Sequence, residues 1–303
     1  ALAVTLPGPF CQERIDLEAD FYYCLAHSQT DREEVEGAIA SYKQSLTADP
    51  DQGSVHFNLG LLLSERGDLN GAVHHYTEAL RLDPGDARAS NNLGSVLEKQ
   101  GQPAAAFDRF AEAARLDPQL AAAQRNLARG LLAAGRAAEA LEPIHRAMAV
   151  EPRPADDHFL LGSVALQTGD TGGAIRELTE SLRLKPTARA HNDLGVTHLG
   201  RGDHEEALAQ FQAAIRLEPD FFDAYGNAAV ALTLLGRLEE ARDAFETAIE
   251  RRPRHIDSLL NLAVVLSRLG ETQEALARLE EILALEPEQA RAGALLEKLS
   301  AGR

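Results

Sequence analysis

The stretch "RLDP" at residues 81–84 decides the fold, because its proline belongs to a series that recurs along almost the whole chain. Successive members lie 34 residues apart, except for one interval of 33. A fixed period of this size indicates a repeat architecture in which each repeat is one supersecondary unit. Proline cannot continue a helix, so each member marks the end of a repeat. The series is Pro50, Pro84, Pro118, Pro152, Pro186, Pro219, Pro253 and Pro287.

Further positions keep the same period when each repeat is numbered so that its proline falls at position 32. Position 8 is always Gly or Ala, and position 15 is Gly in every repeat but the first. Small residues at positions 8 and 20 let two helices approach closely, and a large residue at position 24 fills the space between them. Glycine at position 15 ends the first helix, where a left-handed backbone is needed. Position 20 is Ala38, Ala72, Ala106, Ala140, Ala174, Ala207, Ala241 and Ala275, and position 24 is Tyr42, Tyr76, Phe110, Ile144, Leu178, Phe211, Phe245 and Leu279.

This pattern resembles the tetratricopeptide repeat family over residues 19–289, about nine-tenths of the chain. The resemblance implies an all-α fold, a right-handed superhelical α-solenoid of about eight helix–turn–helix repeats whose first helices line a concave groove. Residues 1–18 are expected to form an irregular extension. Residues 290–303 are expected to form a C-terminal capping helix and tail, because the last apolar face of a solenoid must be covered. The repeats are expected at 19–52, 53–86, 87–120, 121–154, 155–187, 188–221, 222–255 and 256–289.

Two repeats depart from the pattern. Pro143 falls inside the second helix of repeat four, where it removes a hydrogen bond and favours a kink. Repeat five has Gly172 and Gly173 at the start of its second helix and is one residue short. These features predict a change of curvature across residues 143–187; the alternative is that the neighbouring repeats absorb both.

An amide recurs at position 6 of the first helix. A carboxamide offers two donors and an acceptor, which match the N–H and C=O groups of an extended peptide whatever its side chains. The series is similar to the asparagine ladder of the repeats of O-GlcNAc transferase, and the resemblance implies contact with a peptide in the groove. The alternative is an inherited consensus with an unoccupied groove. The expected ladder is Asn58, Asn92, Asn126, Asp193, Asn227 and Asn261, interrupted at Leu160 and widened by Asn91 at position 5.

Charged and apolar residues next to this ladder differ between the two halves of the chain. Arg88, Arg125 and Arg129 are expected to form a cationic patch that takes a carboxylate, unless they pair with nearby acids such as Glu98. They do not match the carboxylate clamp of chaperone-tail-binding repeats, because repeat two has Phe57 where that clamp needs lysine. The later repeats carry an apolar strip edged with acid, which suits a basic amphipathic segment unless the adjacent repeat covers it. The strip comprises Phe159, Leu160, Val196, Val230, Leu260 and Val264, with Asp156, Asp193, Asp223 and Asp257 at its edge.

Composition limits the classes of partner. The formal net charge of −17 repels phosphate backbones, so nucleic acid is not expected as a partner. No apolar stretch approaches the ~18 residues that span a bilayer, so no membrane insertion by this segment is expected. Oligomeric state is left open by the sequence.

The N-terminal end of the sequence gives an indication of the cellular compartment. The sequence starts at Ala1 rather than Met, which suits removal of a signal peptide or anchor, or a piece of a longer chain. Cys11 and Cys24 form a disulfide if the protein is exported and remain reduced thiols if it is cytoplasmic. Export to the periplasm or the extracellular space is slightly favoured.

Catalytic and metal-binding motifs are not found in the sequence, so no catalytic residue, cofactor or metal is expected. His74 and His75 are adjacent and are expected to diverge, and His191 and His198 are too far apart along one helix to share an ion. The sequence thus predicts a non-enzymatic scaffold that binds an extended segment of a partner protein in its groove. Two alternatives stay open: a structural subunit of a larger assembly, held through its edges and N-terminal extension, and the substrate-recruiting module of a longer enzyme such as a glycosyltransferase.

Overall fold

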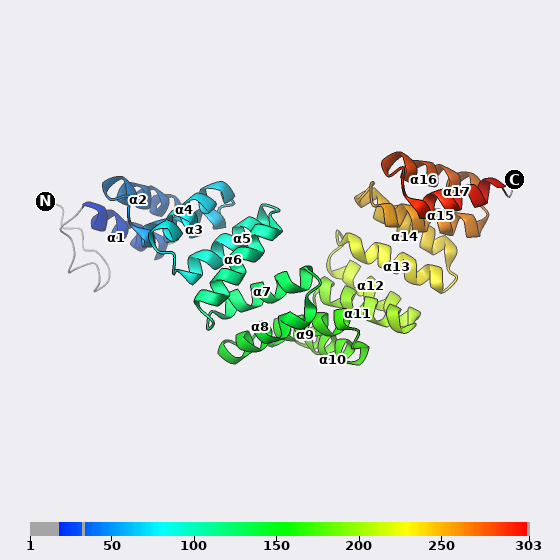
Figure 1. The fold of residues 1–303 in the computed structure, drawn as a ribbon, viewed down its shortest axis with the longest axis horizontal. Coiled ribbons are helices and arrows are strands. Elements are labelled where there is room, and N and C mark those ends of the chain that lie inside the picture. The colour runs from blue at the N-terminus through cyan, green and yellow to red at the C-terminus, as the bar shows by residue number, and fades with distance from the viewer. Residues whose placement is uncertain (1–17, 32–33, 302–303) are drawn as a thin grey trace. The chain divides into compact units, whose positions relative to one another are not determined.

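A computed structural model describes residues 18–31 and 34–301, and every regular element in these ranges is a helix (Figure 1). The 17 helices are each 12 to 15 residues long. They are α1 (Glu18–Asp31), α2 (Val35–Ala48), α3 (Gly53–Glu65), α4 (Leu69–Leu82), α5 (Ala87–Lys99), α6 (Pro103–Leu116), α7 (Ala121–Ala133), α8 (Ala137–Val150), α9 (Pro154–Thr168), α10 (Thr171–Leu184), α11 (Ala188–Arg201), α12 (His204–Leu217), α13 (Phe222–Leu234), α14 (Leu238–Arg251), α15 (Ile256–Leu269), α16 (Thr272–Leu285) and α17 (Ala290–Ala301).

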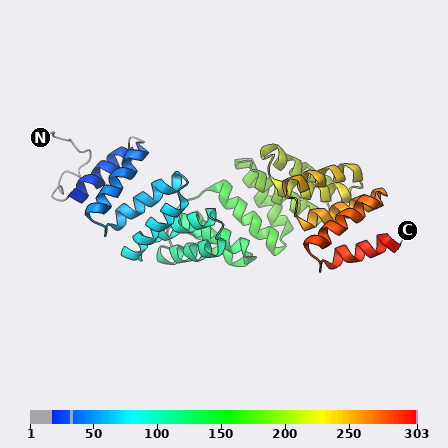
Figure 2. The same cartoon turned by 90° about the horizontal axis from the view of Figure 1, so that it is seen from above.

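Consecutive helices pack as antiparallel pairs, one pair to each repeat, and within each of two units every pair packs on the next (Figure 2). The chain divides into two compact units, Ala1–Pro152 and Arg153–Arg303. In both units the odd-numbered helix is the first of its pair and the even-numbered helix is the second. The all-α solenoid that the sequence predicts is therefore confirmed.

Glycine, and in two repeats aspartate, define the turn between the two helices of a pair. Every glycine at position 15 has a positive φ, from 71° at Gly135 to 90° at Gly202, so each adopts the left-handed conformation that ends the first helix. In two repeats an aspartate then caps the second helix: the Asp68 carboxylate accepts from the backbone N–H of Gly71 at 2.9 Å, and that of Asp170 from Gly173 at 2.8 Å.

The small and large positions of the pattern meet inside each pair. A Cβ placed on Gly94 would lie 2.7 Å from Cε1 of Phe110, and one on Gly195 would lie 2.6 Å from Cε1 of Phe211. The alanines at position 20 are all buried. Close approach of the two helices therefore depends on these side chains staying small.

The two irregular repeats keep unbroken second helices of 14 residues each. Helix α8 continues through Pro143, whose side chain is buried. Helix α10 also keeps its 14 residues, since the Asp170 cap holds its glycine-containing first turn. The missing residue of repeat five falls in the loop after α10, where three residues (185–187) stand instead of the four at 83–86. The change of curvature over residues 143–187 stays a prediction.

Helix α17 closes the apolar end of the second unit. Its Leu295, Leu296 and Leu299 pack against a buried cluster that includes Leu259 and Leu279 of α15 and α16. Cys24 is buried on α1, whereas Cys11 lies outside the described residues, so their disulfide also stays a prediction.

Candidate functional site

The candidate site is the surface of the first helices that carries repeat positions 2, 5, 6 and 9, which we call the ladder face. The structure places the predicted residues there at different depths. Asn91, Asn126 and Arg125 are buried, with 8%, 7% and 5% of their surface exposed. The others are partly or fully exposed: Asn58, Asn92, Asp193, Asn227, Asn261, Arg88 and Arg129.

Two hydrogen bonds of the same kind join neighbouring repeats across this face. Asn126 Nδ2 on α7 donates to Asn91 Oδ1 on α5 at 2.8 Å. In the second unit, Asn227 Nδ2 on α13 donates to Asn192 Oδ1 on α11 at 2.9 Å. Each bond runs from position 6 of one repeat to position 5 of the repeat before it. We call this arrangement the asparagine clamp.

The clamp gives the position-6 amide a structural role that its periodicity alone did not indicate. A hydrogen bond of this kind contributes about 1 kcal/mol, and loss of one partner leaves a desolvated amide unpaired. A role for Asn192 was not predicted from the sequence, because its partner Asn227 stands at a different repeat position, position 6 of the following repeat. The signal was present: an asparagine followed by another 35 residues later occurs at both clamps.

The remaining position-6 amides are not held by a clamp. Asn92 bonds the hydroxyl of Tyr76, whose pKa is raised by burial, and its Oδ1 lies 3.4 Å from Nδ2 of Asn91. The side chains of Asn58 and Asn261 make no hydrogen bond to any part of the chain that the structure describes. These three amides keep donors and acceptors available at the surface.

The arginines of the predicted cationic patch separate into two groups. The Arg125 guanidinium is buried and donates to the carbonyl oxygen of Glu151, at the end of α8. Arg129 is exposed and donates to the Asn126 amide oxygen, and Arg88 is exposed and lies 5.1 Å from the centre of the Phe57 ring. The expectation that Arg125 contacts a ligand is corrected here, because protein atoms enclose its guanidinium. Of the three arginines, Arg88 and Arg129 present their charge at the surface.

Asp193 is the one acidic member of the ladder. Burial raises the pKa of its carboxyl group. The carboxylate accepts from Ser163 Oγ and from Asn192 Nδ2, each at 3.4 Å. Leu160 is buried, as is Leu260, so neither belongs to an exposed apolar strip. Phe159, Val196, Val230 and Val264 keep part of their surface exposed.

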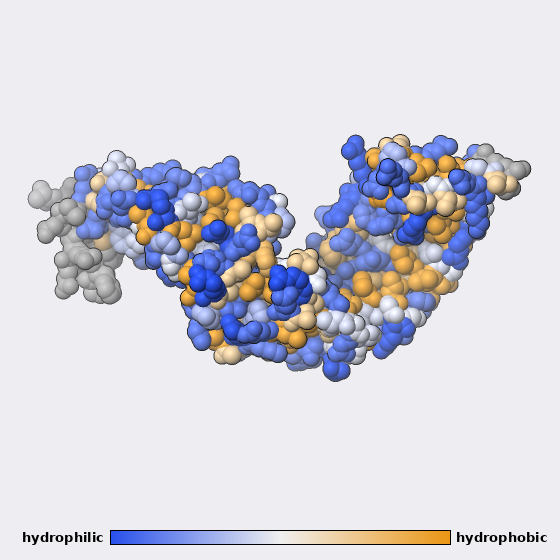
Figure 3. All heavy atoms as spheres, in the orientation of Figure 1, coloured by the Kyte–Doolittle hydropathy of each residue, from blue (hydrophilic) through white to orange (hydrophobic). Residues whose placement is uncertain are grey.

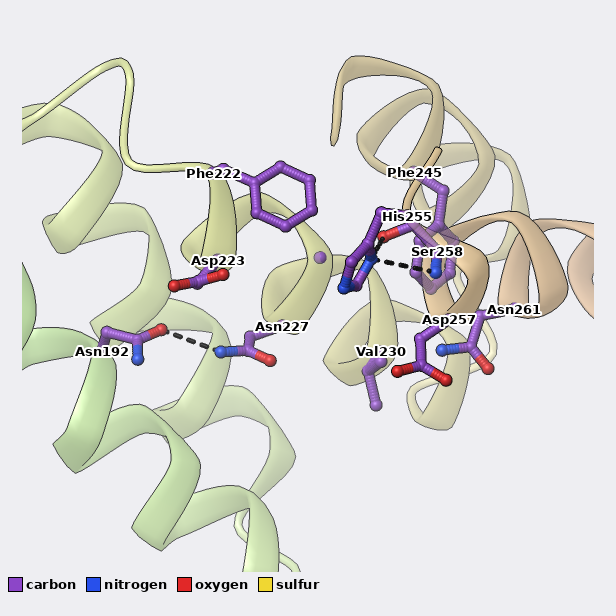
Figure 4. A pocket seen from close by; sticks show the side chains of 11 residues that line it. Asn192, Phe222, Asp223, Asn227, Val230, Phe245, His255, Asp257, Ser258 and Asn261 are labelled. Atoms are coloured by element: carbon purple, nitrogen blue, oxygen red, sulfur yellow. Dashed lines mark hydrogen bonds between the residues drawn. The ribbon is translucent and has the colours of Figure 1, made fainter. Parts of the chain in front are cut away.

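A pocket of about 330 Å³ opens on the ladder face between α13 and α15 (Figure 4). Hydrophobic residues gather over α13 in the space-filling view and are bordered by hydrophilic ones (Figure 3). The pocket combines amides, carboxylates and aromatic surface. Its lining is Asn192, Phe222, Asp223, Gly226, Asn227, Val230, Phe245, His255, Asp257, Ser258 and Asn261.

The histidines and other polar residues at position 4 have structural partners. His56 Nε2 lies 3.1 Å from the carbonyl oxygen of Pro50, Gln124 Nε2 donates to that of Pro118 at 3.2 Å, and the Tyr225 hydroxyl to that of Pro219 at 3.1 Å. In these three repeats position 4 therefore holds the entering loop, whereas His158 and His191 contact Glu177 and Gln210 on the second helix of their own repeat.

His75 lies in a group of three histidine rings. Its Nδ1 lies 2.9 Å from Nδ1 of His56, and burial lowers its pKa to about 4. The expectation that His74 and His75 diverge is wrong, since their ring centres are 4.8 Å apart. No set of three or more His, Cys, Asp and Glu side chains in residues 18–31 and 34–301 is arranged to hold a metal ion.

Family models for the tetratricopeptide repeat match residues 57–121, 125–189 and 192–256, and a second model of the same description matches residues 232–299. The chain is a tetratricopeptide repeat protein. The repeats of this family generally act as protein-interaction scaffolds and bind protein partners. Across the described residues, no helix has both the length and the apolar character to cross a bilayer.

Known relatives agree with this assignment. A TPR repeat-containing protein of Pseudomonas aeruginosa is 43% identical over 82 residues, which are 27% of this chain and 31% of the relative. Two solved structures share the fold. A chain of the APC/C hetero-tetramer Cut9–Hcn1 aligns with a TM-score of 0.70 and 21% identity, over 96% of this chain and 58% of that one. A tetratricopeptide repeat protein from Parabacteroides merdae aligns with a TM-score of 0.63 and 14% identity, over 82% and 99% of the two chains.

Proposed function

We propose that this protein is a non-enzymatic scaffold that holds an extended segment of a partner protein along its ladder face. The single observation that carries the proposal is the set of partly exposed amides on that face, of which Asn58 and Asn261 make no side-chain hydrogen bond within the described residues. Asn58 and Asn92 lie in neighbouring repeats of the first unit, and Asn227 and Asn261 in neighbouring repeats of the second. All four are partly exposed, and a carboxamide can both donate to and accept from a peptide backbone.

The spacing of repeats suits an extended ligand. Packed helices lie about 8–10 Å apart, and an extended chain advances ~3.3 Å per residue. Amides in neighbouring repeats could therefore each engage about every third residue of a peptide. In this proposal the buried Asn91, Asn126 and Arg125 support the face, and the exposed groups of the ladder contact the ligand.

Charge differs along the proposed binding face. Arg88 and Arg129 present positive charge in the first unit, and Asp223 and Asp257 present negative charge in the second. Arginine forms paired hydrogen bonds with carboxylates. The ladder face of the first unit therefore best suits an acidic peptide segment, and that of the second unit best suits a basic one.

The test replaces two exposed amides, Asn58→Ala with Asn92→Ala, in the full chain. Crosslinking mass spectrometry in the source cells first identifies the partner, and a pull-down then compares the variants. We expect the double variant to lose the partner while its melting temperature stays within a few degrees of wild type. The matched control is Gln44→Ala, an exposed amide on the second helix α2, which should keep the partner. Full retention of the partner by the double variant would refute the proposal.

A structural role in a larger assembly is the second candidate. The fold is shared with a chain of the hetero-tetramer Cut9–Hcn1. The match covers 96% of this chain but only 58% of that one, so the other chain is longer. Native mass measurement separates the two candidates, because groove binding predicts a discrete chain in the absence of partner and an assembly subunit predicts an obligate complex. Recruitment of substrates for a longer enzyme is a variant of the first candidate, and the length of the complete gene product decides it.

A further inference from the structure

The pocket between α13 and α15 exists because one side chain is absent. Position 5 of repeat seven is Gly226, where repeats three and six have the clamp asparagines Asn91 and Asn192. A Cβ added to Gly226 would meet only Ser258 Oγ, at 3.7 Å, within the 4 Å contact range. The space that a clamp asparagine would fill is therefore open.

The same glycine leaves the next amide of the ladder without its clamp partner. Asn261 occupies position 6 of repeat eight and lines the pocket with Asn227 (Figure 4). Asn227 is tied to Asn192, while Asn261 makes no side-chain hydrogen bond within the described part of the chain. Glycine inside a helix is destabilising relative to alanine. The pocket is thus formed at a position where glycine lowers the stability of the helix.

Two carboxylates give the pocket its charge. Asp223 and Asp257 occupy position 2 of α13 and α15 and approach the pocket from its two sides (Figure 4). Asp257 forms no ion pair among the residues that the structure describes. Asp223 lies 3.7 Å from Arg252, yet 54% of its side chain stays exposed. Both acids also lie in the first turn of their helices, where they offset the helix dipole.

Away from the two carboxylates, the walls of the pocket include apolar side chains. Val230 and Phe222 line it, and His255 packs edge-on against the Phe222 ring with 4.9 Å between ring centres. A long basic side chain matches this arrangement, because its methylene stem can lie on apolar surface while its charged end reaches a carboxylate. The volume of about 330 Å³ lies at the small end of the range for ligand pockets, which suits one side chain better than a cofactor.

We propose that this pocket receives a lysine or arginine side chain of a peptide whose backbone is held by Asn227 and Asn261. The inference rests on the proposed function of the ladder face and adds the residue type that its C-terminal part selects. The charge complementarity is local: Asp257 and Asp223 line the pocket, whereas Arg252, 4.2 Å from the centre of the Phe222 ring and 3.7 Å from Asp223, is not among the lining residues.

The test selects peptides from a random phage-displayed library on the full chain and on four variants. Gly226→Asn fills the pocket and restores a clamp partner for Asn261 without changing the net charge, so it separates the pocket from the general attraction of an acidic protein for basic peptides. Asp257→Asn removes one carboxylate. The controls are Gly226→Ala, which leaves most of the space open, and Glu250→Gln, which removes an exposed acid from the second helix α14.

We expect wild type, Gly226→Ala and Glu250→Gln to enrich peptides with a recurring lysine or arginine, and Gly226→Asn and Asp257→Asn to lose that preference. Replacing the selected basic residue by glutamine should weaken binding to wild type by about fivefold or more in fluorescence polarisation, and should have little effect on binding to Gly226→Asn. The identity of the enriched residue distinguishes lysine from arginine.

Other outcomes overturn the inference. Enriched peptides without a recurring basic residue, or a basic preference that persists in Gly226→Asn, would show that the pocket does not select the residue, while the proposed function would stand. Failure of every form of the protein to enrich any peptide would overturn the proposed function and this inference together. Circular dichroism confirms folding of each variant, and Asp257→Asn provides the decision if Gly226→Asn does not fold.

Discussion

Asn126 Nδ2 lies 2.8 Å from Asn91 Oδ1, and this contact joins repeat four to repeat three between two buried side chains. The same pair of positions is joined in the second unit by Asn227 and Asn192. Inter-repeat interfaces contribute to the stability of a solenoid as nearest-neighbour interactions. Each clamp is therefore a polar element of an interface that is otherwise formed largely by small and apolar side chains.

The first prediction concerns this clamp. Asn126→Ala leaves the buried Asn91 amide oxygen without its donor, so the free energy of unfolding should fall by about 1–3 kcal/mol. Urea denaturation measures the change. Asn58→Ala, at the same repeat position without a clamp, should cost less than about 0.5 kcal/mol. Equal effects of the two substitutions would show that the clamp contributes nothing. In a double-mutant cycle, the effects of Asn91→Ala and Asn126→Ala should not be additive, because the two side chains are partners.

Two glycines on first helices should respond to alanine in opposite ways. Gly226→Ala should stabilise the protein by about 0.5–1 kcal/mol, because the position is helical and the new methyl group meets no closer neighbour than Ser258 Oγ at 3.7 Å. Gly94→Ala should destabilise it, since the methyl group would lie 2.7 Å from the Phe110 ring. Thermal unfolding of the two variants tests both signs. A lower melting temperature for Gly226→Ala would contradict the assignment of an open pocket.

The turn glycines should be sensitive for a different reason. Gly135 has a φ of 71° and a Cβ there would meet nothing within 4 Å, so Gly135→Ala changes backbone strain alone. A left-handed conformation costs an alanine about 1–2 kcal/mol, and we expect a loss of stability of that size in urea denaturation. Gly200→Ala, a solvent-exposed helical glycine with equally open surroundings, should not be destabilising.

His75 predicts a dependence of stability on pH. Its pKa is about 4 in the folded protein against 6.5 ordinarily, chiefly because of burial and then because of the neighbouring His56. The unfolded chain therefore binds more protons between these values, so this contribution to stability is complete above pH about 6.5 and is lost as the pH falls towards about 4. His75→Gln should flatten the fall in melting temperature over that range. His145→Gln, an exposed histidine on α8, serves as the control and should leave the slope unchanged.

Residues that act within one repeat could be read from the sequence. Position 15 requires a left-handed backbone and position 24 fills the space beside position 8, and both requirements are local enough for periodicity to reveal them. The clamps could not be read from one position, because the partner of Asn126 is set by position 5 of the preceding repeat. The pocket was harder still to foresee, since it results from the absence of a side chain at Gly226. The histidine prediction failed because adjacency in the sequence does not fix side-chain direction: the His74 and His75 rings lie 4.8 Å apart, and Nδ1 of His75 also lies 2.9 Å from Nδ1 of His56.

The clamp also means that the repeats of this chain are not interchangeable modules. Deletion of repeat three, residues 87–120, would make Phe57 the position-5 neighbour of Asn126, and phenylalanine has no side-chain amide to accept the hydrogen bond. Deletion of repeat seven, residues 222–255, would instead bring Asn261 into register with Asn192, at the same 35-residue separation as the existing clamps, and would remove the pocket at the same time. The order of the repeats thus determines which clamps can form. Removal of one repeat can either break an asparagine clamp or create one.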